Sequence, residues 1–433
     1  MPALLALALL ALPQEPESWL QERLPGLVGL YQDLHRNPEL SFQESRTSSL
    51  LAERLRGLGF EVTEGVGGTG VVGLLENGAG PRLLLRTDMD ALPVEEATGL
   101  PWASRARAQT ADGRETGVMH ACGHDLHMTV WAGTLEWLAA HREAWSGTLL
   151  AVAQPAEEIG AGARAMLEDR LYERFGRPDY CLALHTASDL PAGWIGWTSG
   201  FALANVDSVD IRIHGRGGHG SAPHTTRDPI VLAARIVLGL QTLVSRELDP
   251  QEPGVVTVGS IHGGTKHNII PETVDLQLTV RSYSDEARRL LLDGIRRTAR
   301  FEARAAGFPE TLLPEVQVRE EEYTPATWND PELVERLNRV FAGVLGPERL
   351  VQRKPTMGGE DFGRYSKAAG SPGYMFWLGA IPEERWRAAQ EPGAPPLPSL
   401  HTNTFAPLAG PAIRTGVLCM TAAVRELLPA AGG

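Results

Sequence analysis

Cysteine is scarce in this sequence. The 433 residues include three cysteines, Cys122, Cys181 and Cys419. Three cysteines cannot all pair with one another, and so few in a long chain exclude the disulfide scaffold of small secreted domains. A chain of this length instead has ample apolar material for a large hydrophobic core, and it is long enough for two domains.

Positive charge is also in deficit. Asp and Glu total 53 residues against 40 Lys and Arg, which gives a formal net charge of -13. A nucleic-acid surface needs clustered Lys and Arg to neutralise phosphates, so we expect no nucleic-acid partner. Solubility is the simplest explanation of the acidity.

Long apolar runs are missing from the body of the chain. Residues 2–13, PALLALALLALP, do form an apolar run, but this run is too short to span a membrane. It resembles the apolar core of an export signal, although no Lys or Arg precedes it. We therefore interpret residues 1–16 as the signal of a periplasmic or secreted protein, with a cytoplasmic location as the alternative, and we expect no membrane partner.

The first half of the chain alternates predicted helices and strands. Apolar residues at helical spacing predict helices over residues 19–37 and 44–58, and short apolar runs predict strands over 83–85, 149–153 and 180–184. The residues that follow these strands are polar: Asp88 and Asp90, then Glu157 and Glu158, then His185. Because ligands bind at the carboxyl edge of strands in an open α/β sheet, we expect these side chains to meet there.

A second pattern begins at Asn205. Predicted strands and helices follow one another in the order β-α-β-β-α-β up to Arg319, which is the order of a ferredoxin-like α+β domain. A further helix after Asp330 and a buried strand over 374–378 then resume the first pattern. We therefore predict a mixed-sheet α/β domain over residues 17–203 and 322–433, with the second domain inserted as residues 204–321.

The densest group of reactive side chains is the stretch 117–127, GVMHACGHDLH. It holds three imidazoles, one thiol and one carboxylate in eleven residues, and apolar residues at helical spacing follow it. Cys122 and His124 would thus lie in a loop that opens a helix. A thiolate and an imidazole bind the same borderline metals, which favours a metal site, and the alternative is an inert buried cysteine beside surface histidines.

The adjacent pair Glu157 and Glu158 is the second informative feature. Side chains of neighbouring residues after a strand diverge, so one carboxylate can bind a metal while the other faces a water molecule. A pair of glutamates is more often a solvated surface, but this pair follows a buried strand and Gln-Pro-Ala. That context favours a functional pair.

Several motifs in this chain are rare in combination. The sequence resembles the dinuclear-metal amidohydrolase and peptidase family that includes aminoacylase, carboxypeptidase G, hippurate hydrolase and the plant hydrolases of indole-acetyl-amino-acid conjugates. The resemblance spans nearly the whole chain and is carried by LHRNPELSFQE (34–44), RTDMDALP (86–93), GVMHACGHDLH (117–127), QPAEE (154–158), GRGGHGSAPH (215–224), HNIIP (267–271) and GGEDF (358–362).

The resemblance implies two divalent metal ions per subunit. The implied ligands are Cys122, His124, Glu158, His185 and His401. One thiolate, one carboxylate and three imidazoles suit Zn first, with Mn, Co or Ni as alternatives. The chain departs from the family after His401, where a proline and an acidic tail usually follow.

The resemblance also implies roles for residues that do not bind metal. Glu157 becomes the general base, and His219 stabilises the oxyanion, often in the active site of a partner subunit. Asn268 and Arg281 occupy positions associated with the carboxylate end of the substrate. Asp90 orients a metal ligand, a role for which Asp125 and Glu360 are also candidates. The inserted domain would then serve as a lid and as the contact between the subunits of a homodimer.

The leading hypothesis is a metal-dependent amidohydrolase that cleaves N-acyl amino acids to a carboxylate and a free amino acid. A metallo-exopeptidase acting on short peptides is the alternative, because the amide and the free carboxylate are common to both substrates. Two further readings are a cysteine hydrolase with Cys122 as nucleophile and His124 or His120 as base, and a metal- or peptide-binding protein without activity. Glu157 counts against the last reading, because a binding protein needs no base.

Overall fold

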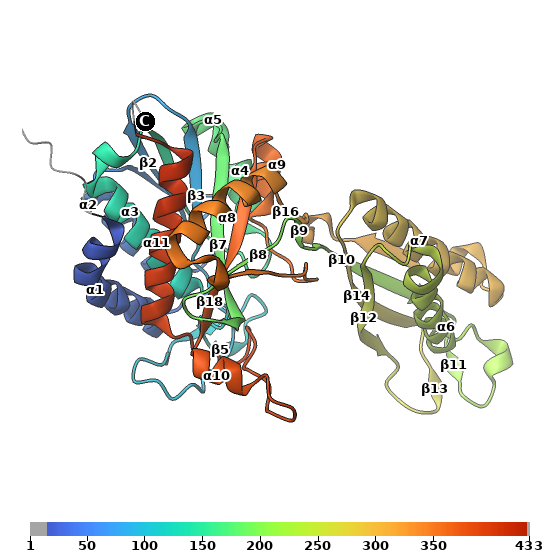
Figure 1. The fold of residues 1–433 in the computed structure, drawn as a ribbon. Helices are drawn as coiled ribbons and strands as arrows, with labels where there is room; N and C mark the ends of the chain where they lie inside the picture. Colours follow the sequence, from blue (N-terminus) through green and yellow to red (C-terminus); the bar gives the residue numbers. More distant parts are fainter. Residues whose placement is uncertain (1–14, 431–433) are drawn as a thin grey trace, which may run out of the picture.

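The computed structural model describes residues 15–430, so the interpretation of residues 1–16 as an export signal falls almost wholly outside the described residues. The chain forms a large and a small lobe that lie side by side (Figure 1). The large lobe is built on an eight-stranded sheet with the order β1-β2-β6-β3-β7-β18-β8-β17. Its strands are β1 Glu61–Val66, β2 Gly70–Asn77, β3 Arg82–Asp88, β6 Gly147–Gln154, β7 Tyr180–Pro191, β8 Ile195–Trp197, β17 Leu350–Gln352 and β18 Gly373–Ile381.

The centre of this sheet is parallel. β3 pairs in parallel with β6 and β7, and β18 pairs in parallel with β7, whereas β1 and β2 are antiparallel. Successive side chains of a strand point to opposite faces, so Leu83 and Leu85 enter one hydrophobic core and Leu84 enters the other. Both faces are buried, which explains why these strands are continuous apolar runs.

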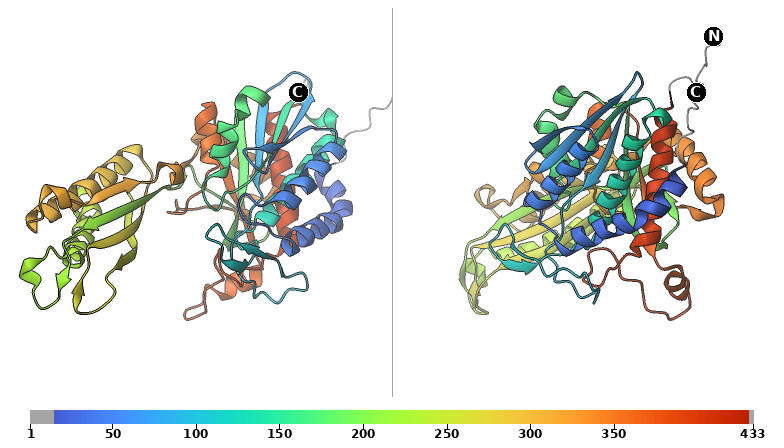
Figure 2. Two further views of the ribbon diagram at one scale, coloured as in Figure 1. Left: turned by 180° about the vertical axis from the view of Figure 1, so that it is seen from behind. Right: turned by 90° about the vertical axis from the view of Figure 1, so that its left-hand side faces the viewer.

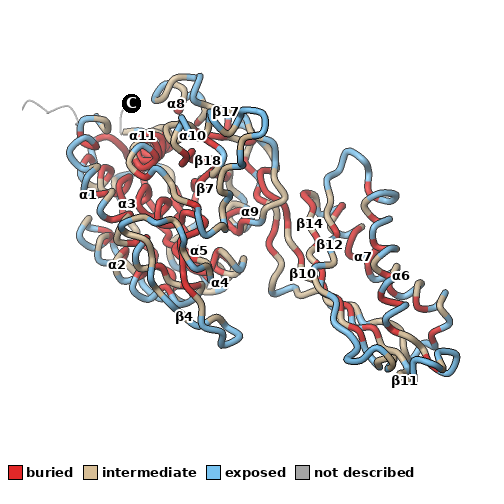
Figure 3. Tube along the Cα trace, turned by 90° about the horizontal axis from the view of Figure 1, so that it is seen from below, coloured by how far each residue is buried: buried red, intermediate tan, exposed pale blue. Residues whose placement is uncertain are grey.

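Helices cover both faces of the large sheet (Figures 1 and 2). The larger core lies under α1 Pro16–Arg36, α2 Ser45–Gly57, α3 His124–Ala140, α8 Pro331–Leu345 and α11 Ala409–Leu427. The smaller core lies under α4 Gly162–Glu168, α5 Leu171–Phe175 and α9 Gly363–Ala369. The central strands of the large sheet and the inner sides of its helices are buried, whereas many of the connecting loops are exposed (Figure 3).

The small lobe has its own sheet and its own core. Its four antiparallel strands have the order β12-β14-β10-β15, with β10 Asn205–His214, β12 Gly254–Gly263, β14 Thr273–Ser282 and β15 Glu315–Val318. Two helices, α6 Pro229–Thr242 and α7 Asp285–Ala305, pack on one face and shield the apolar side chains of the strands. Asp228 and Ser284 cap these helices through their side chains, which accept hydrogen bonds from the first free N–H groups.

The chain enters and leaves the small lobe at one place. β9 Gly200–Leu203, before the lobe, pairs with β16 Thr327–Asn329, after it. A further bridge joins Val206 to Thr324. The two connections therefore run side by side and form the link between the lobes.

Two details differ from the sequence analysis. His185 was expected beyond the end of its strand, but β7 continues to Pro191 because β18 pairs with it from Cys181 to Ala187 and again at Pro191. Within the described residues, the helical stretch Pro229–Glu247 has the length and composition of a membrane span, although Arg235 interrupts it. Apolar helices of folded domains meet the same test, and one side of this stretch packs into the core of the small lobe.

Candidate metal centre

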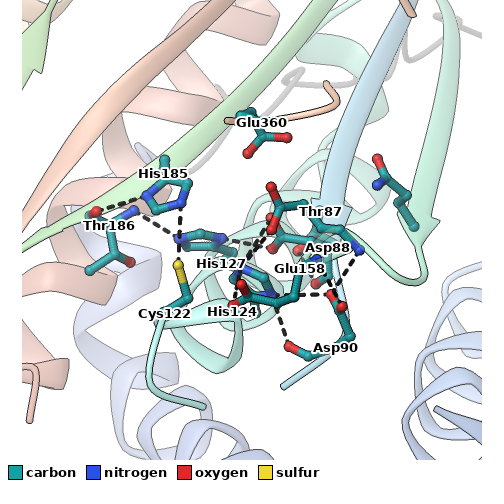
Figure 4. Close-up of polar contacts among 12 residues, drawn as sticks. Thr87, Asp88, Asp90, Cys122, His124, His127, Glu158, His185, Thr186 and Glu360 are labelled. Carbon is teal, nitrogen blue, oxygen red and sulfur yellow. Dashed lines mark hydrogen bonds and ion pairs between the residues drawn. The ribbon is translucent and has the colours of Figure 1, made fainter. Parts of the chain in front are cut away.

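Polar side chains converge at the carboxyl edge of the parallel strands (Figure 4). β7 contributes His185, the turn after β6 contributes Glu157 and Glu158, and the loop that opens α3 contributes Cys122 and His124. The carboxylates of Asp88 and Asp90, at the end of β3, face the same space. The convergence expected from the strand ends is therefore present.

The five residues selected as ligands lie together. Cys122 Sγ is 3.5 Å from His185 Nε2 and 3.3 Å from His401 Nε2. Glu158 lies 3.5 Å from His401 Nε2 through Oε2 and 3.8 Å from His124 Nε2 through Oε1. Such separations are close to the edges of a ligand tetrahedron with metal bonds of about 2.0–2.3 Å. Cys122 is shared between a group with His124 and His185 and a group with Glu158 and His401.

The hydrogen bonds of two histidines leave the same ring nitrogen free. Nδ1 of His124 donates to the backbone oxygen of Asp90 at 2.8 Å, and Nδ1 of His185 donates to the backbone oxygen of Thr186 at 2.8 Å. Each Nε2 then faces the cluster. His124 Nε2 and Glu158 Oε1 are buried without a hydrogen-bond partner, which costs about 1–3 kcal/mol per group unless something binds there. These two atoms fit a metal ion well.

The electrostatics of the site favour a cation. Burial lowers the pKa of His124, but Asp88, Asp90 and Glu158 outweigh burial and raise this pKa to about 10. Burial raises the pKa of Glu158 to about 8, although His124 opposes the shift. The carboxylates around His124 therefore leave the site with an excess of negative charge. This excess favours a cation at the free nitrogen of His124.

Cys122 is not prepared to act as a free nucleophile. Burial, together with the charges of Glu158 and Glu157, raises the pKa of its thiol well above the ordinary value. A catalytic cysteine needs a lowered pKa, usually from a neighbouring cation. His120 does not supply one, because burial lowers its own pKa to about 4. The raised pKa therefore counts against Cys122 as a free nucleophile.

Gly123 allows Cys122 and His124 to approach the cluster together. Its backbone is left-handed, with φ of 87°. A Cβ atom at this position would lie 2.9 Å from Oγ1 of Thr186, which is too close. Glycine is required here for both reasons.

Asp90 organises the glutamate pair. Oδ1 accepts a hydrogen bond from the backbone N–H of Glu157 at 3.1 Å, and Oδ2 accepts one from that of Glu158 at 3.0 Å. Ser41 donates to Oδ2 at 2.6 Å. With the backbone bond to His124, Asp90 contacts two segments of the cluster, which is the arrangement expected of a residue that orients ligands.

A buried network of ion pairs around Arg86 lies next to the cluster. Arg86 is 2% exposed, and it binds Asp88 at 2.6 Å, Glu360 at 2.8 Å and Asp361 at 3.4 Å. Glu360, a candidate for orienting ligands, is thus held by Arg86. Arg86 is a functional residue missed at the sequence level, although its place at the end of an apolar strand was a usable signal.

His127 has a structural role beside the cluster. Nδ1 donates to Asp88 at 2.7 Å, and Nε2 accepts a hydrogen bond from the backbone N–H of Thr186 at 2.8 Å. Both nitrogens are satisfied, and burial lowers the pKa of the ring to about 4. The neutral imidazole therefore links β3 to β7 beside His185.

Three predicted site residues lie outside this cluster. His219 is exposed, in β11 Gly218–His219, at the end of the small lobe remote from the large lobe (Figure 1). Asn268 is beside it, because the backbone N–H of Gly220 donates to the Asn268 carbonyl oxygen at 2.8 Å. Arg281 instead reaches the large lobe, where Nη1 donates to the backbone oxygen of Met357 at 2.6 Å. A single chain therefore does not bring His219 or Asn268 to the cluster.

His401 approaches from a separate loop. Its backbone is left-handed, with φ of 66°, and its N–H donates to the carbonyl oxygen of Ala121 at 2.9 Å. Its side chain is 56% exposed, unlike the other four candidate ligands. This loop therefore forms the solvent side of the cluster.

A cavity of about 500 Å³ opens beside the cluster. Thr186 and Leu400 line this cavity, and they are the sequence neighbours of His185 and His401. Apolar groups form much of the lining, and the Arg353 guanidinium in the wall is paired with Asp189 at 2.7 and 2.9 Å. The lining residues that matter below are Trp377, Pro396, Leu397 and Leu400.

Comparisons with known proteins agree with this geometry. Residues 84–392 match the model of peptidase family M20/M25/M40. The chain is 37% identical to thermostable carboxypeptidase 2 of Saccharolobus solfataricus, over 86% of this chain and 88% of that protein. It is 37% identical to the hippurate hydrolase of Campylobacter jejuni, over 76% of this chain and 82% of that protein.

The solved structures extend the agreement to the fold. The YXEP protein of Bacillus subtilis, described as a dinuclear metal binding peptidase, superimposes with a TM-score of 0.76 at 30% identity. The match covers 95% of this chain and 99% of that one. The chain therefore belongs to peptidase family M20/M25/M40 and is a hydrolase of amide bonds.

Proposed function

We propose that this enzyme hydrolyses N-acyl amino acids with the help of two divalent metal ions. One observation carries the proposal: Glu157 and Glu158 diverge at a cluster in which Cys122 is shared by two groups of ligand atoms. Glu158 faces His124 and His401, whereas Glu157 also lies near Glu360 and Asp361. The two carboxylates can therefore perform different tasks.

Cys122, His124, Glu158, His185 and His401 would hold the ions. Zn fits the donor set first, and Mn, Co or Ni is an alternative. When bound, such ions polarise the amide carbonyl and lower the pKa of water. The free Nε2 of His124 and the unpartnered Oε1 of Glu158 support this assignment.

Glu157 is the general base in this proposal. It is 7% exposed, and burial together with Glu360 and Glu158 raises its pKa well above the ordinary value. A carboxylate with a raised pKa can accept a proton from the attacking water and hold it. Glu157 then delivers the proton to the leaving amine nitrogen.

The cavity beside the cluster is the proposed site of the acyl group. Trp377 and Leu397 give it an apolar wall, and the Arg353 charge is neutralised by Asp189. An uncharged aromatic or aliphatic acyl group fits such a lining. Hippurate carries an acyl group of this class, and one relative is a hippurate hydrolase.

A metallo-exopeptidase is the second candidate function. Two relatives of this chain are named carboxypeptidases, and a peptide shares the amide and the free carboxylate with an N-acyl amino acid. The cluster acts on the amide alone, so it serves both substrates. The two candidate functions differ in the group on the acyl side of the amide, which is an amino-acid residue in a peptide and a simple acyl group in an N-acyl amino acid.

A homodimer through the small lobe completes the proposed site. β12 is an edge strand of the small sheet, and α6 beside it exposes apolar side chains, with Val231 58% and Leu238 71% exposed. Two copies can cover these surfaces in an isologous contact. His219 and Asn268 would then reach the cluster of the partner subunit, where His219 stabilises the oxyanion.

The test is metal content measured together with hydrolysis. We expect about two ions per chain and chelator-sensitive cleavage of hippurate, N-acetyl amino acids or indole-acetyl amino acids. Dipeptides in the same panel separate the two candidate functions. Activity that is indifferent to chelator, or a protein that binds no metal after remetallation, would overturn the proposal.

A further inference from the structure

Glu44 is a buried carboxylate that the proposed chemistry does not use. It is 0% exposed and precedes α2, yet its side chain makes no capping bond to that helix. Oε1 instead accepts a hydrogen bond from the backbone N–H of Ala156 at 2.9 Å, 112 residues away. Oε2 accepts one from the hydroxyl of Thr69. The carboxylate therefore serves a distant segment.

The residues that Glu44 holds have unusual backbones. Oε1 also accepts a hydrogen bond from the N–H of Phe42 at 3.0 Å. Ala156 has φ of 49° and Phe42 has φ of 59°, and in the described chain four non-glycine residues in all have positive φ. Left-handed backbone is unfavourable for residues with a Cβ atom, so the surroundings must hold it in place.

Ala156 directly precedes the glutamate pair. The N–H groups of Ala156, Glu157 and Glu158 are three in succession, and each donates to a buried carboxylate. Glu44 binds the first, while Asp90 binds the second and third. The two acids together determine the backbone path from which the side chains of Glu157 and Glu158 diverge.

We propose that Glu44 is a positioning residue that holds Ala156 in the left-handed conformation and thereby aims Glu157 and Glu158 at the cluster. The roles of these two glutamates rest on the function proposed above. Glu44 itself touches neither ligand atoms nor the reacting bond. Burial and the nearby charge of Asp90 raise the pKa of Glu44 to about 7, while the hydrogen bonds from Thr69 and Ala156 oppose this shift.

A rescue experiment tests this inference. Glu44→Ala removes the acceptor, so we expect metal affinity or kcat to fall about 10–100-fold, with little change in KM. Glycine adopts positive φ readily, so Ala156→Gly in the same chain should restore much of the loss. Glu44→Gln keeps an oxygen for the N–H of Ala156 and should retain most of the wild-type affinity.

Asn329→Ala provides a matched control. Asn329 is also buried and accepts a hydrogen bond from the backbone N–H of Met375 at 2.9 Å, but it has no contact with the glutamate pair. We expect this variant to lose thermal stability without a selective loss of metal affinity. If it lowers affinity as much as Glu44→Ala, or if Ala156→Gly rescues nothing, Glu44 is only structural.

Amide hydrogen exchange distinguishes the failure of this inference from the failure of the proposed function. Exchange at residues 156–158 should accelerate in Glu44→Ala even where no substrate is cleaved or no metal binds. Unchanged exchange there would overturn the positioning role. A wild-type protein without metal-dependent hydrolysis would overturn the proposed function alone.

Discussion

Nε2 of His401 lies 3.3 Å from Sγ of Cys122, although the two residues are 279 positions apart in the sequence. The contact joins the solvent-side loop to the loop that opens α3. We expect His401→Ala to weaken binding of at least one metal ion by more than about tenfold, since a lost ligand costs more than a lost supporting contact. Competition with a chromophoric chelator measures the affinity.

His262→Ala is the control for that experiment. His262 is exposed on β12 and lies outside the candidate ligand groups. We expect its metal affinity to equal that of the wild type. Equal affinity in His401→Ala would remove His401 from the ligand set.

The general base can be separated from the ligands. We expect Glu157→Gln to lower kcat by about 10²–10⁴-fold, because proton transfer is lost while the shape of the side chain is kept. Metal content should not change. The exposed Glu143→Gln serves as the control, and parallel loss of metal and activity in Glu157→Gln would show that Glu157 is a ligand instead.

The buried imidazole of His35 makes stability depend on pH. His35 Nδ1 lies 2.7 Å from Asp125 and Nε2 lies 3.1 Å from Glu96. Burial lowers the pKa of His35, but the two carboxylates raise it from 6.5 to about 9. Because the folded value lies above the ordinary one, this stabilisation is fully present below pH 6.5 and is lost as pH rises through 9.

His35→Gln tests that dependence. We expect it to lower the free energy of unfolding by about 3–5 kcal/mol at pH 6, since it leaves two buried carboxylates without their partner. The difference in Tm from the wild type should shrink between pH 7 and pH 10, as measured by scanning calorimetry. A difference that stays constant over this range would contradict the assignment.

The cavity should select the acyl group. Leu397 lines it and belongs to no candidate ligand group. We expect Leu397→Phe to lower kcat/KM for benzoylglycine relative to acetylglycine about tenfold, because the larger side chain fills the space of the aromatic ring. Leu408→Phe, at a position 40% exposed, should leave the ratio unchanged.

Mixed dimers test whether His219 acts across the subunits. Glu157→Gln and His219→Ala chains are each expected to be nearly inactive alone. After co-expression, random pairing should recover about a quarter of wild-type activity, because half of the dimers contain one complete site. No recovery would place His219 in the site of its own chain.

Leu238→Arg, on the exposed face of α6, should yield monomers in light scattering.

Local patterns predicted the elements well because their causes are local. The apolar run of β3 and the helical spacing of apolar residues in α1 and α2 each depend on neighbours within a few residues. The end of β7 was misjudged because β18, which extends it, lies almost two hundred residues later in the chain. Pairing between distant strands leaves no trace in the local sequence.

The sequence by itself determined the chemistry of this protein: the reactive residue types, their order in motifs and the strand ends that carry them. Only the tertiary structure decided which atoms meet. It placed Nε2 of His124 free in the cluster, Arg86 among three carboxylates, Glu44 on the backbone of Ala156 and His219 far from its own site. The reason is physical, since local sequence sets backbone preference and periodicity, whereas burial and hydrogen-bond partners depend on segments that only the folded chain brings together.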